Sequence, residues 1–152
     1  MILEVITYLA EKLYNLREPW ALVGGSNLFL RKCIDKTNDV DIISTETGVS
    51  LIYKKLYCHT IIEPNWSEYE NIRSLFYSAC IYDIRIEVMG EPINHFDGQW
   101  VKNCWWKNSI ESLQFEDLIV PCTSLYYEKM INIRLKNYDR ALSIENFKKY
   151  PQ

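Results

Sequence analysis

Two short runs decide the fold of this chain: Trp20-Ala21-Leu22-Val23-Gly24-Gly25-Ser26, and then Asp39-Val40-Asp41-Ile42-Ile43-Ser44. The first begins with an apolar run stopped by two glycines, which predicts a short buried strand over 20–23. Ser26 is a favourable N-cap, and the apolar residues after it predict a helix over 27–33. The second run predicts another strand over 39–44. The sequence therefore predicts a strand, a glycine corner, a helix and a second strand in close succession.

Asp39 and Asp41 stand two residues apart on the second of these strands. Residues two apart on a strand point to the same face, so both carboxylates should project together while Val40 enters the core. Two neighbouring carboxylates repel each other unless a cation lies between them, and Mg²⁺ suits them when phosphates supply further oxygen ligands. A solvated strand face would also explain such a pair. The pair indicates a metal site because the glycine corner lies beside it.

Gly24 and Gly25 lie where the first strand meets the helix. Glycine lets the backbone approach a ligand closely, and the N–H groups of a helix's first turn attract anions. The corner therefore predicts phosphate contacts from Gly24, Gly25 and Ser26, although an ordinary tight turn would also account for the glycines. Because the helix returns the chain, the corner and the acidic pair should face one triphosphate.

The rest of the chain predicts more helices and strands, and so an α/β (α+β) fold with a small mixed sheet flanked by helices. We expect an amphipathic helix from Ile2 to Leu16, a helix from Thr47 to Leu56, and antiparallel strands over 72–81 and 83–89. Gly90-Glu91-Pro92 should end the latter strand. Residues 59–71 read as a loop with at most one edge strand, and residues 100–106 as a strand and turn.

The C-terminal part predicts a helical segment over about 122–150. Pro121 should precede a helix that is capped by Thr123 or Ser124 and runs to about Asn137. Its expected inner face comprises Leu125, Lys129, Met130 and Ile133. Asp139 should cap a last helix that ends near Tyr150. With no repeat or linker in the sequence, we expect a single domain over 1–152.

Composition narrows the classes of protein. The chain has 152 residues, of which 48% are hydrophobic and 24% charged, which is typical of a globular domain. No apolar run can span a bilayer, and the first residues lack a basic signal-peptide region, so we expect a cytoplasmic protein without membrane contact.

The five cysteines form no CxxC pair, which argues against a zinc site. The net charge of −3 gives no general attraction for nucleic acid, but residues 128–149 are basic, either as a solvated helix face or as a phosphate-facing surface.

The motifs together resemble the polymerase-beta nucleotidyltransferase superfamily. Its signature is Gly-Gly-Ser, a spacer of twelve residues, and Asp-hydrophobic-Asp-hydrophobic, as at 24–26 and 39–42. The run over 34–42 is similar to its small bacterial and archaeal members, which include antibiotic nucleotidyltransferases and abortive-infection toxin enzymes. The resemblance extends from about Trp20 to Glu145. It implies the nucleotidyltransferase fold.

The resemblance also implies the parts of an active site. Such proteins take a third carboxylate from a later strand, and Glu87 fits that pattern, with Asp83 as a rival. They also have a proline, a helix with an inward lysine, a basic residue and an aspartate, matched in order by Pro121, Lys129, Arg134 and Asp139. Two Mg²⁺ ions would be held by Asp39, Asp41 and Glu87. Lys129 would neutralise phosphate charge, and Glu87 could accept the proton of the attacking hydroxyl.

The implied reaction moves a nucleoside monophosphate from a nucleoside triphosphate, such as ATP, to a hydroxyl and releases pyrophosphate. The acceptor stays open between a small molecule, a protein and an RNA end, as does completion of the site by a partner protein or a homodimer. Two alternative functions stay open. The first is a catalytically inactive nucleotide-binding or interaction module of the same fold, and the second is a toxin-type enzyme directed at RNA. The presence of both Asp39 and Asp41 favours the enzyme.

Overall fold

The computed structural model describes residues 1–149 and contains a mixed sheet of eight strands. The helices are α1 (Ile2–Leu13), α2 (Gly24–Leu30), α3 (Glu46–Lys55), α4 (Leu125–Arg134) and α5 (Tyr138–Lys149), with short 3₁₀ turns η1 (Tyr57–His59) and η2 (Trp105–Ser109). The strands are β1 (Trp20–Val23), β2 (Asp39–Ser44), β3 (Thr60–Tyr69), β4 (Ile72–Ile81), β5 (Ile84–Phe96), β6 (Gln99–Lys102), β7 (Ile110–Phe115) and β8 (Leu118–Thr123). They run in the order β3-β4-β5-β2-β1-β8-β7, and β6 pairs with β5. The expected mixed sheet flanked by helices is confirmed.

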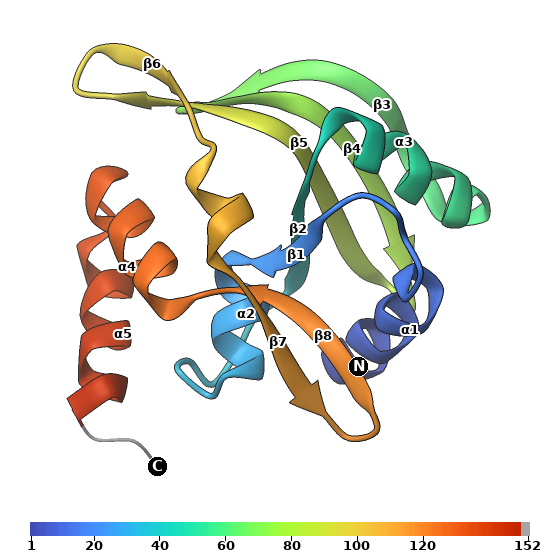
Figure 1. The fold of residues 1–152 in the computed structure, drawn as a ribbon, viewed down its shortest axis with the longest axis horizontal. Coiled ribbons are helices and arrows are strands. Elements are labelled where there is room, and N and C mark those ends of the chain that lie inside the picture. The colour runs from blue at the N-terminus through green and yellow to red at the C-terminus, as the bar shows by residue number, and fades with distance from the viewer. Residues whose placement is uncertain (150–152) are drawn as a thin grey trace.

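The two faces of the sheet are covered differently (Figure 1). Helices α1 and α3 lie on one face, where Leu9, Val40 and Ile52 are fully buried in the main core. The opposite face carries α4 and η2 over β1 and β2, with Tyr127 and Trp106 in a second buried cluster. Burying a side chain of this size contributes about 1.5–3 kcal/mol. The helices on this second face are therefore held by a smaller core, and they lie beside the strands that carry the acidic pair.

The predicted strands over 20–23 and 39–44 are confirmed, but the helix between them begins earlier than expected. It starts at Gly24, with Val23 as its N-cap residue, so Ser26 lies inside the helix and is not its cap. Gly24 has a φ of +67°, a conformation that glycine adopts without strain. At this glycine the chain passes directly from β1 into α2, so the last residue of the strand, Val23, is also the N-cap residue of the helix.

The central sheet is larger than the sequence predicts. Residues 60–69 form the edge strand β3, which the sequence had left open as an alternative to a loop. Strand β5 continues through Gly90 to Phe96, so the prediction that Gly90-Glu91-Pro92 ends a strand is wrong. Glycine is needed at position 90 because α3 packs closely against β5 there. A Cβ at Gly90 would lie 2.6 Å from Val49 Cγ2. The hairpin of β7 and β8 is also unpredicted, and it contains Pro121.

The C-terminal helices agree with the prediction in number but not in detail. Ser124 caps α4 by accepting a hydrogen bond from the Tyr127 N–H at 3.1 Å, one of the two caps expected. Because β8 runs to Thr123, the helical segment starts at Leu125 and not at 122. Asp139 lies in the first turn of α5 and does not cap it, and the expected end at Tyr150 lies outside the described residues.

The N-terminal helix ends at Leu13, before the predicted Leu16. All five cysteines are free thiols. Within residues 1–149, no helix has the length and apolar character needed to cross a membrane.

Candidate active site

The acidic pair lies on the central strand β2, on the sheet face that also carries α4 and η2, as the strand alternation predicts. Val40 is fully buried, whereas Asp39 and Asp41 are partly exposed on the opposite side of β2. Strand β2 pairs in parallel with β5 and places Asp41 directly beside Glu87, and Asp39 beside Arg85. Residues in register on neighbouring strands share a face, so Asp39, Asp41 and Glu87 all lie on this side of the sheet.

The glycine corner meets this acidic group. A Cβ at Gly24 would lie 3.2 Å from Asp41 Oδ2, so glycine leaves room for the carboxylate. The buried Ser26 hydroxyl donates to the Val23 carbonyl and accepts from the Asp41 N–H, both at 3.3 Å. Ser26 thus fixes the corner to β2, and its hydroxyl is already engaged within the protein. The predicted convergence of the corner and the acidic pair is present in the structure.

The surroundings of Asp41 disfavour the ionised form of its carboxyl group. Burial, followed by the nearby charges of Asp39 and Glu87, raises the pKa of Asp41 from 3.8 to about 7, while Arg140 acts in the opposite direction. Desolvation and like charges both disfavour the ionised carboxylate. A divalent cation would relieve both effects, since it supplies the missing charge and oxygen coordination.

The donor set fits Mg²⁺ only in part as it stands. Glu87 forms an ion pair with Arg85 at 3.0 Å, and no three Asp, Glu, His or Cys side chains among residues 1–149 are gathered closely enough to hold a metal. The side chains of this pair are 57% (Arg85) and 29% (Glu87) exposed, and such a pair contributes little to stability. Breaking this pair therefore costs little, but turning Glu87 towards Asp41 brings two carboxylates together and requires a cation between them. Asp83 lies in the turn before β5, with a φ of +62°, so Glu87 is the better-placed third acid.

A cavity of about 210 Å³ is lined by Gly24, Asp41 and residues of α4 and α5. Its walls combine apolar side chains with asparagine amides and one cation; they include Ile43, Met89, Asn94, Asn103, Tyr127, Ile131, Asn132 and Arg140. Ligand sites in proteins have this composition, with mostly apolar walls and a few polar groups that orient the ligand.

Arg140 is the cation at this corner, and the sequence did not identify it. Its Nη2 lies 3.7 Å from the position that a Cβ on Gly25 would take. It forms no ion pair with any residue in the described part of the chain. An arginine in this position can form paired hydrogen bonds with a phosphate.

The two cations that the resemblance implied are engaged elsewhere. Lys129 Nζ binds Glu145 Oε2 at 2.6 Å and does not line the cavity. The guanidinium of Arg134 lies over the rings of Trp105 and Phe96, 4.8 and 5.3 Å from their centroids. The reason is the orientation of α4, which buries Tyr127, Glu128, Ile131 and Asn132 and not the predicted inner face.

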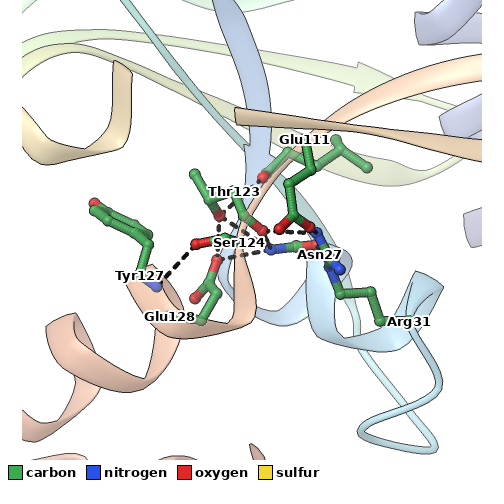
Figure 2. Close-up of polar contacts among 8 residues, drawn as sticks. Asn27, Arg31, Glu111, Thr123, Ser124, Tyr127 and Glu128 are labelled. Atoms are coloured by element: carbon green, nitrogen blue, oxygen red, sulfur yellow. Dashed lines mark hydrogen bonds and ion pairs between the residues drawn. The ribbon is translucent and has the colours of Figure 1, made fainter. Parts of the chain in front are cut away.

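Glu128 is the functional candidate that the sequence analysis missed. It is fully buried, and Figure 2 shows its carboxylate turned towards Asn27 and Thr123. Glu128 Oε1 accepts hydrogen bonds from the Gly24 N–H at 2.8 Å, Asn27 Nδ2 at 3.0 Å and Thr123 Oγ1 at 2.7 Å. Burial raises the pKa of Glu128, while these bonds and Arg140 oppose the rise. The Gly24 N–H expected to face phosphate is therefore occupied, and no sequence signal distinguished Glu128 from a solvated helix residue.

Comparison with solved structures identifies the architecture. A protein of Thermotoga maritima that was provisionally described as a nucleotidyltransferase matches with a TM-score of 0.82 at 22% identity, over 97% of this chain and 92% of that one. The chain has the nucleotidyltransferase fold. The lincosamide antibiotic adenylyltransferase LnuA, solved with lincomycin, matches with a TM-score of 0.61 at 12% identity, over 93% of this chain and 95% of LnuA. ANT(2″)-Ia, solved with adenylyl-2″-tobramycin, matches with a TM-score of 0.57 at 11% identity, over 93% of this chain and 86% of that one.

No protein-family model matches the sequence, and no curated protein is significantly similar to it. The resemblance first noted in the motifs is therefore carried by the three-dimensional fold.

Proposed function

We propose that this protein is an enzyme that transfers a nucleoside monophosphate from a nucleoside triphosphate to a hydroxyl acceptor and releases pyrophosphate, with Mg²⁺ as cofactor. The observation that carries the proposal is Asp41, which lines a cavity together with Gly24 and shares its sheet face with Asp39 and Glu87. Perturbed acids in a cleft are typical of functional sites. The nucleotidyltransferase fold supports the same reaction class.

Asp39 and Asp41, with Glu87 once it leaves Arg85, are the residues that would hold two Mg²⁺ ions. When bound, such ions neutralise phosphate charge and activate the attacking hydroxyl. Ser26 contributes by fixing the Asp41 backbone, so the carboxylate is positioned before any ligand arrives. This preorganisation lowers the cost of assembling the site.

Arg140, and not Lys129, is the residue we assign to the phosphates. It lies over Gly25 without an ion-pair partner in residues 1–149, whereas Lys129 is bonded to Glu145. Gly25 itself is required by packing against the loop before β2, because a Cβ there would lie 2.8 Å from Thr37 Oγ1. Fixed cations aimed at a transferring phosphoryl group stabilise its developing charge.

The acceptor has its own space on the other side of the acidic group. A cavity of about 470 Å³ lies over β3, β4 and β5, and its lining includes Glu87, Arg85, Phe76 and Tyr69. Glu87 is placed to accept the proton of a hydroxyl that enters there. The lincomycin and adenylyl-tobramycin of the structural neighbours make a small molecule the first acceptor class to test.

Isothermal titration calorimetry with Mg²⁺ and each of ATP, GTP, CTP and UTP tests the site. We expect at least one nucleotide to bind the wild type and D41N to lose that binding while it stays folded. The variant D35N makes the same change at an exposed position of the loop before β2 and should bind as the wild type does. Equal affinity in D41N would refute the metal site.

Transfer itself requires a second measurement, because a module that only binds nucleotides would pass the first. Incubation with alpha-labelled nucleotide and cell extract should label an acceptor and release pyrophosphate, and D41N should do neither. Binding without label transfer would support the inactive module.

A further inference from the structure

The two glycines of the corner face opposite charges. Glu128 from α4 is bonded to the Gly24 N–H, whereas Arg140 from α5 lies over Gly25. A triphosphate at neutral pH is an anion without hydrogen-bond donors, so it is attracted to Arg140 and repelled by Glu128. The phosphates therefore belong on the Gly25 side, and a different part of the ligand must meet Glu128.

Only one of the two carboxylate oxygens of Glu128 is hydrogen-bonded within residues 1–149. Its Oε1 accepts three hydrogen bonds, but its Oε2 is buried and has no partner among the described residues. Figure 2 shows this second oxygen pointing away from Thr123 and Asn27. Buried polar atoms are almost always hydrogen-bonded, and Glu128 lines the cavity, so this oxygen would be satisfied by a donor from a ligand or by an ordered water.

A second orphan acceptor belongs to the same cavity. Asn103 donates from Nδ2 to Asn94 Oδ1 at 3.1 Å and to the Tyr127 hydroxyl at 2.7 Å, while its own Oδ1 is buried without a partner in residues 1–149. Both orphan atoms are oxygens, and both belong to residues of the cavity lining. The cavity thus favours a ligand part that carries O–H or N–H donors and tolerates apolar walls.

We propose that this cavity binds the nucleoside end of the triphosphate and that Glu128 Oε2 accepts a hydrogen bond from a ribose hydroxyl, which makes the site selective for ribonucleotides over deoxyribonucleotides. The inference rests on the proposed function and adds its sugar specificity. Of the parts of a nucleotide, the sugar and the base carry donors and the phosphates do not. Carboxylates bind ribose hydroxyls in other nucleotide sites in the same way. A deoxy analogue would leave a buried carboxylate oxygen unpaired, which a hydrogen-bonding site rejects strongly.

The wild-type protein gives the first test. Calorimetry with Mg²⁺ compares the tightest-binding of the four ribonucleoside triphosphates with its 2′-deoxy and 3′-deoxy forms. We expect at least one deoxy form to bind about tenfold more weakly or worse, in line with the loss of a hydrogen bond to a charged group. Equal affinity for all three forms would overturn the inference and leave the proposed function standing. Absence of binding by every ribonucleotide would refute the proposed function itself.

The variant E128Q gives the second test. Glutamine keeps one oxygen for Gly24, Asn27 and Thr123 but removes the charge and the second acceptor. We expect E128Q to bind the ribonucleotide with about the affinity of the deoxy form, while the deoxy form binds as before. E145Q makes the same change in a half-buried ion pair with Lys129, outside the cavity lining, and should keep the wild-type preference. Tighter binding of both forms by E128Q would show that Glu128 blocks the corner and would overturn the inference. If E128Q does not fold, the wild-type comparison alone decides.

Discussion

Replacing Asp41 by asparagine should stabilise the metal-free protein at neutral pH. The folded structure raises the pKa of this carboxyl from 3.8 to about 7, so folding favours its protonated form. Below about pH 4 the group is protonated in both states and costs nothing. Between about pH 4 and pH 7 the unfolded chain releases the proton first, so the free energy of unfolding falls as pH rises. Each tenfold change in proton affinity is 1.36 kcal/mol, which gives a ceiling of about 4 kcal/mol above pH 7.

The assay is urea unfolding of both proteins, followed by tryptophan fluorescence, at several pH values in the presence of a chelator. The D41N protein lacks this titration, so the difference in unfolding free energy should grow from near zero at pH 4 to between about 2 and 4 kcal/mol at pH 8. D35N, at an exposed position, controls for the loss of one negative charge. A difference that does not change with pH, or a D41N protein that is less stable at pH 8, would refute the assignment of Asp41 as a desolvated acid beside two others.

Two further predictions follow from named contacts. R140Q should weaken binding of the Mg²⁺–nucleotide about tenfold or more in calorimetry, because it removes the cation over Gly25. K129Q should leave the affinity unchanged. The reverse result would assign the phosphate contact to Lys129. G90A should lower the free energy of unfolding by about 1–3 kcal/mol in urea titrations, because its Cβ would overlap Val49, and an unchanged midpoint would show that α3 does not pack tightly on β5.

The first half of the site was predictable because its determinants are local. Strand alternation places Asp39 and Asp41 on one face, and the glycine pair marks the point where the chain turns from strand to helix. Alternation also shows that Glu87 lies opposite its buried neighbours Ile86 and Val88. Its role as third acid came from the family resemblance, and its place beside Asp41 depends on the parallel pairing of β2 with β5.

The second half depends on where distant segments pack. Pairing of β7 with β8 was not visible in the sequence, and because β8 runs to Thr123, α4 starts at Leu125. A shift of one residue on a helix rotates a side chain by about 100°, which exchanges Lys129 for Glu128 at the cavity. Arg140 reaches Gly25 across more than a hundred residues of sequence, so no local pattern could connect them.

The sequence by itself determined the acidic pair, the glycine corner and their meeting, because short-range periodicity dictates which way neighbouring side chains point. Only the tertiary structure decided which charges complete the corner. The burial of Glu128, and the position of Arg140 without an ion-pair partner in residues 1–149, follow from how α4 packs on the sheet and α5 on α4; such packing is fixed by contacts between residues far apart in the chain.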